Sequence, residues 1–195
     1  MAVSLRKGQR INLTKDAGLK NALVGLGWDT NRYDGSEEFD LDLVLFMLGK
    51  DGKVVDDRYI IYYGKGHDKD PEEAIFYSGD NRNGEGDGDD ESVVIDFSKI
   101  SPIVNKIVVA VTIYDATVRN QNFGMVDNSY IRFVNTATGE ETHNYPLCEN
   151  FSIQKSVIFG EFYKNGNDWN FKAVGEGYDK ELEDLCIEYG LEVDD

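Results

Sequence analysis

The run from Phe39 to Leu48 constrains the fold more than any other part of the sequence. In an extended strand, alternate side chains point to opposite faces. One face then carries Leu41, Leu43, Leu45 and Met47, and the other carries Asp40, Asp42, Val44, Phe46 and Leu48. Because both faces are apolar from Leu43 onward, this strand needs a covering layer on each side. Lys106 to Tyr114, rich in β-branched residues, predicts a second buried strand.

The remaining chain contains many short strand-like segments separated by Gly, Asn and Asp turns, such as Asp51-Gly52 and Thr138-Gly139. Further strands are predicted over 11–14, 23–28, 59–63, 74–77, 92–97, 130–135, 141–147, 156–163 and 169–174. Without alternating helices, this pattern predicts an all-β fold, an antiparallel β-sandwich. The sequence shows no internal repeat or linker, so we expect a single domain over residues 1–195.

A short C-terminal helix is predicted over residues 179–189. Leu182, Leu185, Cys186 and Tyr189 follow helical spacing, and Asp179 is the expected N-terminal cap. Gly190 is suited to end the helix. We expect its apolar face to cover the sandwich.

Residues 79–91 hold six carboxylates, four glycines and one arginine, with no apolar side chain. Glycine permits the backbone to turn through positive φ, so the carboxylates can converge on one point. Calcium takes six to eight oxygen ligands and suits such a loop. The alternative is a solvated acidic hairpin loop. The spacing does not fit an EF-hand, because the sixth residue from Asp80 is Glu85 and that from Asp87 is Ser92.

Asp40 and Asp42 lie on one face at the entrance of the predicted central strand. Two carboxylates there are costly without a partner, although a strand-end pair can also be a solvated edge. Together with the acidic loop, the pair favours a shared metal site. Since the acids exceed what one calcium needs, we expect two neighbouring ions.

The formal net charge is -17, concentrated in residues 79–91 (-5) and 179–195 (-7). This charge argues against nucleic acid as a partner, because phosphate neutralisation needs Lys and Arg. No signal-peptide pattern or membrane-length apolar run is present, so we expect a cytoplasmic protein without membrane insertion. Cys148 and Cys186 show no metal-binding spacing and are expected to be buried thiols.

Catalytic patterns are weak. His67 and His143 lie in polar stretches and are expected at the surface, and no G-x-S-x-G motif occurs. The clustered acids fit metal binding better than the paired carboxylates of a glycosidase. We therefore expect a non-catalytic protein. The alternative is a metal-dependent hydrolase or nucleotide-processing enzyme that uses the same loop, beside which Arg82 is the one basic residue.

Several segments resemble the TerD family of tellurium-resistance and general stress proteins. They are Met1-Ala2-Val3-Ser4-Leu5, Val24-Gly25-Leu26-Gly27-Trp28-Asp29, Phe39-Asp40-Leu41-Asp42, Gly79-Asp80-Asn81, Gly84 to Glu91, Ile113-Tyr114-Asp115-Ala116 and Phe159-Gly160-Glu161-Phe162-Tyr163. The matches run in order along nearly the whole chain. The resemblance implies a calcium-binding β-sandwich linked to tellurite resistance and stress, without an established catalytic activity.

By the same resemblance, the metal region comprises Asp40, Asp42, Asp80, Asn81, Glu85, Asp87, Asp89, Asp90 and Glu91, with Asp29 as a weaker candidate. Asn83 stands where the family usually has Thr, and Leu43 to Phe46 is bulkier than the family pattern. The partners implied are other Ter-type stress proteins and an integral membrane component.

Overall fold

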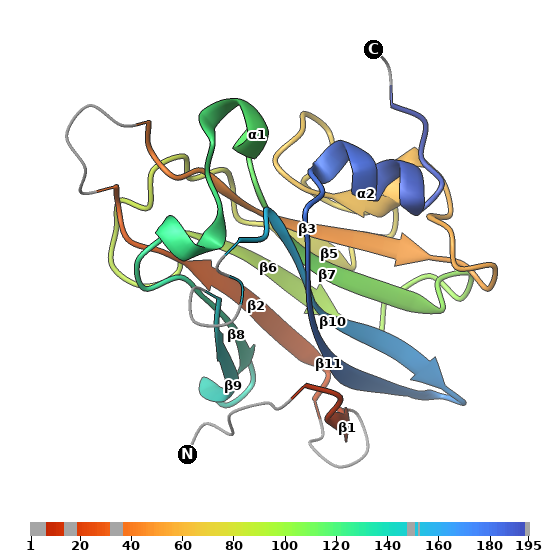
Figure 1. Ribbon diagram of the computed structural model, residues 1–195. Coiled ribbons are helices and arrows are strands. Elements are labelled where there is room, and N and C mark those ends of the chain that lie inside the picture. The colour runs from red at the N-terminus through yellow and green to blue at the C-terminus, as the bar shows by residue number, and fades with distance from the viewer. Residues whose placement is uncertain (1–6, 14–18, 32–36, 148–150, 152, 194–195) are drawn as a thin grey trace.

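The computed structural model describes residues 7–13, 19–31, 37–147, 151 and 153–193. Two antiparallel sheets stack face to face within these residues (Figure 1). The first sheet has the order β1-β11-β10-β7-β3-β4 and comprises β1 (Arg10–Asn12), β11 (Asp168–Tyr178), β10 (Ser156–Asn165), β7 (Lys106–Ile113), β3 (Leu41–Leu48) and β4 (Ile60–Ile61). The second has the order β5-β6-β2-β8-β9 and comprises β5 (Ile75–Tyr77), β6 (Glu91–Asp96), β2 (Asn21–Gly27), β8 (Tyr130–Asn135) and β9 (Glu140–Pro146).

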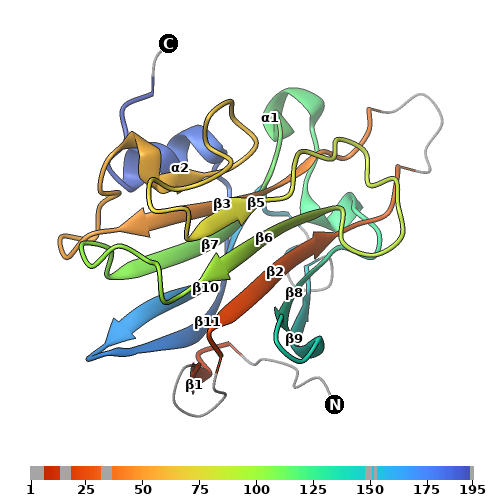
Figure 2. The same ribbon diagram turned by 180° about the vertical axis from the view of Figure 1, so that it is seen from behind.

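Every strand pairing within the two sheets is antiparallel, which confirms the predicted β-sandwich. Figure 2 shows β5, β6 and β2 of the second sheet running side by side. Aromatic side chains from both sheets fill the space between them. Phe133 of β8 lies 5.1 Å from Phe162 of β10 and 5.2 Å from Phe171 of β11, between ring centroids. All three rings are buried, so they join the two layers.

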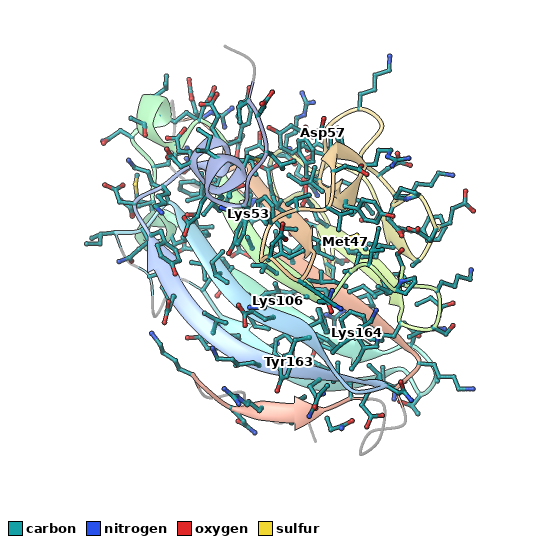
Figure 3. The ribbon with its side chains drawn as sticks, turned by 90° about the vertical axis from the view of Figure 1, so that its right-hand side faces the viewer. Met47, Lys53, Asp57, Lys106, Tyr163 and Lys164 are labelled. Carbon is teal, nitrogen blue, oxygen red and sulfur yellow. The ribbon has the colours of Figure 1, made fainter. Side chains whose placement is uncertain are left out.

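The predicted two-sided burial of β3 is confirmed, because all eight of its residues are buried. Its outer face, away from the second sheet, is covered by α2 (Leu182–Glu188), and the Phe46 ring lies 4.7 Å from that of Tyr189. The helix crosses only one end of the first sheet (Figure 1). Beyond it the outer face becomes polar, as Lys106 and Tyr163 in Figure 3 illustrate.

The helix begins later than predicted. Its cap is Glu181, whose side chain accepts from the backbone of Asp184 while the Asp184 side chain accepts from Glu181 N at 3.0 Å. This reciprocal capping box satisfies two helix-end donors at once. Asp179, the predicted cap, instead pairs with Lys155 Nζ at 2.8 Å. Gly190 follows the helix with φ of 88°, as its predicted role requires.

Short helical turns were not predicted from the sequence. Tyr59, predicted as strand, ends the 3-10 turn η1 (Asp57–Tyr59) before the two-residue strand β4. A one-turn helix α1 (Ala116–Arg119) and a 3-10 turn η2 (Phe123–Met125) lie between β7 and β8. Strand β11 also continues past its predicted end at Val174 to Tyr178, where it remains paired with β10.

Two further expectations concern reactive side chains. Cys186 is a buried free thiol, as expected, while Cys148 lies outside the described residues. His67, expected at the surface, keeps part of its side chain exposed. It is half-buried because its ring packs 4.9 Å from Tyr62 and its Nδ1 lies 3.2 Å from the Ile60 carbonyl oxygen. The side chain of His143 is not among those described.

Candidate metal centre

Three of the predicted carboxylates meet at one corner of the sandwich. Asp42 lies at the start of β3, Asp40 directly precedes that strand, and Asp80 comes from the loop between β5 and β6. One oxygen of each carboxylate lies within 4.8 Å of the other two. Two oxygens on one calcium are at most roughly 5 Å apart, twice the metal–oxygen distance. The three side chains are therefore close enough to share one ion.

Burial and mutual repulsion disfavour the charged forms of these carboxylates. Burial, and then the charge of Asp80, raise the pKa of Asp40 to about 6. Burial, and then the charge of Glu91, raise the pKa of Asp42 well above its usual range. Only 7% of Asp40 and 2% of Asp42 is exposed. A positive charge placed among these carboxylates would lower the raised pKa values of both side chains.

One carboxylate oxygen of the corner lacks a partner among the described residues. Asp40 Oδ1 is buried and accepts no hydrogen bond from the described residues, which is uncommon for an acceptor in a folded protein. Its other oxygen lies 3.9 Å from Arg119 Nη2, beyond hydrogen-bond distance. Asp80 accepts from Arg82 Nε at 2.8 Å, but that arginine is largely exposed. The donor set consists of hard oxygens, so the residues fit calcium.

These side chains line an open cavity of about 620 Å³. Arg82 and Arg119 lie in its wall together with Tyr63 and Tyr114. Arg119 packs over the Tyr114 ring at 5.0 Å and pairs with Glu37 at 3.3 Å. The cavity thus has a buried acidic floor and a mixed, partly basic wall.

Glu91 is buried next to the corner, and its carboxylate accepts hydrogen bonds from backbone N–H groups. It is fully buried and accepts a hydrogen bond from Leu43 N at 2.8 Å, which joins β6 to β3 across the two sheets. It also accepts from Asn81 N at 3.4 Å. Burial raises the pKa of Glu91 to about 8. The charge of Glu91 raises the pKa of Asp42. Both carboxylate oxygens of Glu91 already accept hydrogen bonds from backbone N–H groups.

Hydrogen bonds of the Asn81 and Asp90 side chains stabilise the conformation of the acidic loop. Asn81 Oδ1 accepts from the backbone of Asn83 and Gly84, and its amide donates to Asp90 Oδ1 at 3.0 Å. Asp90 Oδ2 accepts from Trp28 N at 2.9 Å. These contacts tie the loop to the end of β2. The side-chain oxygens of both residues are used within the protein.

Asp89 points away from the corner. Arg132 of β8 donates to both of its oxygens, with Nε–Oδ1 and Nη2–Oδ2 distances of 2.7 and 2.9 Å. The Tyr130 hydroxyl adds a bond of 3.1 Å to Oδ1. The carboxylate lies over Gly25 of β2, where any Cβ atom would collide with it. The Asp89–Arg132 pair therefore clamps the loop onto the outer face of the second sheet.

Three other predicted residues also lie apart from the corner. Asp29 and Asp87 line a separate cavity of about 450 Å³ together with Asn128, whose amide donates to Asp29 at 2.8 Å. Glu85 is exposed, and its backbone rather than its side chain bonds to Asn81 and Asn83. Across the described residues, Asp40, Asp42 and Asp80 form the one carboxylate group close enough to hold an ion by three side chains.

Sequence reasoning missed the two arginines outside the loop that organise this region. Arg132 interrupts β8 on its outer face, and Arg119 lies in the one-turn helix α1. An arginine within an otherwise apolar strand pattern is a signal of a carboxylate partner. The sequence does not say which of the six loop acids is that partner.

The sequence and the fold both resemble those of known proteins. The sequence model of the TerD domain matches residues 1–189. The chain belongs to the TerD family. It is 43% identical to general stress protein 16U of Bacillus subtilis (strain 168) over 194 residues, 99% of this chain and 100% of that protein. It is 44% identical to tellurium resistance protein TerD of Serratia marcescens over 192 residues, 98% of each chain.

A solved structure confirms the TerD fold. A homologue of the telluride resistance protein (TerD) from Streptomyces coelicolor A3(2) superposes with a TM-score of 0.74 at 22% identity, covering 87% of this chain and 96% of that one. The family model and the two relatives confirm the family expected from the sequence. In the described part of this TerD-family chain, no helix is both long and apolar enough to cross a bilayer.

Proposed function

We propose that this protein is a non-catalytic, calcium-binding stress protein associated with tellurite resistance. The observation that carries the metal assignment is the Asp40–Asp42–Asp80 corner, with a buried carboxylate oxygen that accepts no hydrogen bond within the described part of the chain. The stress and resistance roles are supported by relatives named for tellurium resistance and general stress. Asp40, Asp42 and Asp80 would hold the ion, which supplies the positive charge that the corner lacks.

The calcium would act on the shape of an acidic surface. Asp80 belongs to the 79–91 loop, whereas Asp40 and Asp42 belong to the first sheet. An ion held by all three would fix the loop against that sheet, while Asp89 and Arg132 fix it against the second sheet. Partners such as other Ter-type proteins, or a membrane component, would then recognise a surface whose order depends on calcium. We also propose that this occurs in the cytoplasm.

Calorimetric titration of chelated protein with calcium tests the proposal. We expect saturable binding and a rise in melting temperature, because an ion that binds only the native state stabilises it by about 2.7 kcal/mol at a hundredfold excess over Kd. Native mass spectrometry counts the ions. Asp29 and Asp87 remain candidates for a second ion, as they share a cavity. Absence of both binding heat and a melting shift would refute the calcium assignment.

The two arginines in the cavity wall favour a second candidate function. Arg82 and Arg119 line the same cavity as the acidic corner, and metal ions combined with arginines stabilise the charge of transferring phosphoryl groups. A metal-dependent phosphoester hydrolase would use this arrangement. Screening phosphoesters with calcium, magnesium and manganese is the test. Turnover that is lost in Asp42→Asn, with folding retained, would establish this candidate over the non-catalytic function.

A further inference from the structure

A second cavity lies beside the metal corner, between the outer face of the first sheet and the start of α2. Its volume is about 350 Å³. It shares Asp42, Tyr63, Tyr114 and Asp115 with the cavity of the metal corner. Residues of β3 and β7 provide its floor, and Figure 1 shows α2 next to β3. The calcium proposal leaves this cavity without a function.

The wall of this cavity is acidic, and none of the described residues that line it is basic. Asp42, Asp115, Glu181 and Glu183 line it, from β3, the end of β7 and the start of α2. They do not form a further group able to hold one ion by three carboxylates, since within the described chain that geometry occurs only at Asp40, Asp42 and Asp80. Negative charge that is distributed over the wall suits an extended organic cation better than a single metal ion.

Aromatic rings occupy the space between these acids. Tyr62 and Tyr63 pack edge to face with centroids 5.1 Å apart, and Tyr63 and Tyr114 do so at 6.1 Å. All three line the cavity, together with the apolar Leu182. Tyrosine faces attract ammonium groups, and their carbon surface packs against hydrocarbon chains. Both properties fit an organic cation.

A buried polar group without a partner lies in the same wall. Thr112 is the cross-strand neighbour of Asp42, so both side chains project from the outer face of the sheet. Only 1% of Thr112 is exposed, and its hydroxyl makes no hydrogen bond within the described protein. A buried hydroxyl normally has a partner. An N–H donor bound in this cavity would provide one.

We propose that this cavity binds an alkylammonium group, a primary amine carried on a short hydrocarbon chain. The acids attract the charge, Thr112 accepts an N–H bond, and the tyrosines with Leu182 enclose the chain. The same chemistry occurs in free diamines and in the lysine side chain of a partner protein. The site shares Asp42 with the calcium corner but does not require the ion.

Titration in chelated buffer tests this site separately from the calcium proposal. The probes are 1,5-diaminopentane, Nα-acetyl-lysine amide and, as an uncharged control of equal length, 1,5-pentanediol. We expect both amines to bind saturably and the diol not to bind. Tighter binding of the diamine would identify a free amine as the ligand, whereas tighter binding of the lysine derivative would identify a protein side chain. Equal binding of the diol, or no amine binding, would overturn the proposal.

Matched variants locate the binding. Thr112→Val removes the acceptor but keeps the shape, and should weaken amine binding about tenfold, whereas Thr112→Ser should bind like the parent. Glu183→Gln should weaken it about threefold, since Glu183 is an exposed acid of the wall. Glu192→Gln, which alters an exposed acid outside the lining, is the control. Unchanged affinity in both Thr112→Val and Glu183→Gln would exclude this cavity as the amine site.

Discussion

Two parts of one acidic loop differ in how their carboxylates are satisfied. Asp89 receives two bonds from Arg132 and one from Tyr130. Asp80, from the same loop, joins Asp40 and Asp42, where a buried oxygen has no donor among the residues that the structure describes. The residue types are the same, and only the neighbours differ. A carboxylate matched by an arginine holds the structure together, whereas carboxylates that face one another create a site for a cation.

The largest effect is expected from Asp42→Asn, which removes one charged ligand from the corner. Calcium affinity should fall by about a hundredfold, equivalent to about 2.7 kcal/mol. The ion-free protein should remain folded, and its stability should be equal or higher, because a buried unpaired charge is lost. Calorimetric titration and thermal melting, each with and without calcium, measure these effects.

The control for this prediction is Asp89→Asn. Because Asp89 faces Arg132 and not the corner, this variant should keep the calcium affinity of the parent within about threefold while it loses stability. Parent-like calcium affinity in Asp42→Asn would show that Asp42 is an ordinary buried strand residue. The two parts of the loop would then not differ in their contribution to calcium binding.

The next largest effect is expected from Arg132→Gln, which leaves Asp89 without its ion pair. Breaking a buried pair costs 3–5 kcal/mol, and this pair is partly exposed, so we expect a loss of about 2 kcal/mol in the free energy of unfolding. Urea denaturation measures the change. The calcium affinity should stay near the parent value, since the corner has its own residues.

The matched control is Arg58→Gln, because Arg58 forms a similar contact with Asp56 at 2.8 Å on the exposed surface. This variant should have no measurable effect on stability. If Arg132→Gln and Arg58→Gln were equally harmless, the Asp89–Arg132 pair would not act as a clamp. A loss of calcium binding in Arg132→Gln would instead show that the two parts of the loop are coupled.

A moderate effect is expected from pH on the ion-free protein. Burial raises the pKa of Asp40 to about 6 and that of Glu91 to about 8. Between about pH 4 and 8, the native state therefore holds protons that the unfolded state has released. This contribution to stability is complete below pH 4, declines as the pH rises, and is lost above about pH 8. Melting temperatures of chelated protein across this range measure it.

The same protons compete with calcium, so calcium affinity should rise with pH over the same window. Glu91→Gln provides the control, since it removes the group with the higher pKa. In this variant, the decline in stability between about pH 6 and 8 should become smaller. A chelated protein whose melting temperature rises steadily from pH 5 to 8 would contradict the raised pKa values.

The fold was largely predictable, because it depends on local patterns. The two apolar faces of Phe39–Leu48 require two covering layers, and the structure provides them as the second sheet and α2. The helix start was not predictable from spacing alone. Asp179 is the favoured cap type, but it pairs with Lys155, which lies close only in the folded protein, and Glu181 caps the helix instead.

The site was predictable as a region but not residue by residue. The sequence indicates that the acids of 79–91 and the Asp40/Asp42 pair belong together, since both need compensation. Which loop acid joins that pair depends on how β5 and β6 are placed against β3 and β8. Asp80 meets residues 40 and 38 positions earlier, whereas Asp89 meets an arginine 43 positions later. Such long-range partners follow from the packing of the two sheets.

The smallest effect is expected from Glu85→Gln, which tests whether proximity or total charge determines binding. Glu85 lies in the same loop, but its side chain is exposed and only its backbone bonds to the loop. Its influence on calcium is therefore a long-range attraction through solvent, which salt screens over about 10 Å at 0.1 M. We expect calcium affinity to fall less than about threefold at low salt and not at all at 1 M salt. The loss in Asp42→Asn should persist at both salt concentrations, because a direct ligand is not replaced by screening. If Glu85→Gln and Asp42→Asn weakened binding equally, and salt abolished both effects, the loop would attract calcium as a diffuse charge and the corner would not be a defined site.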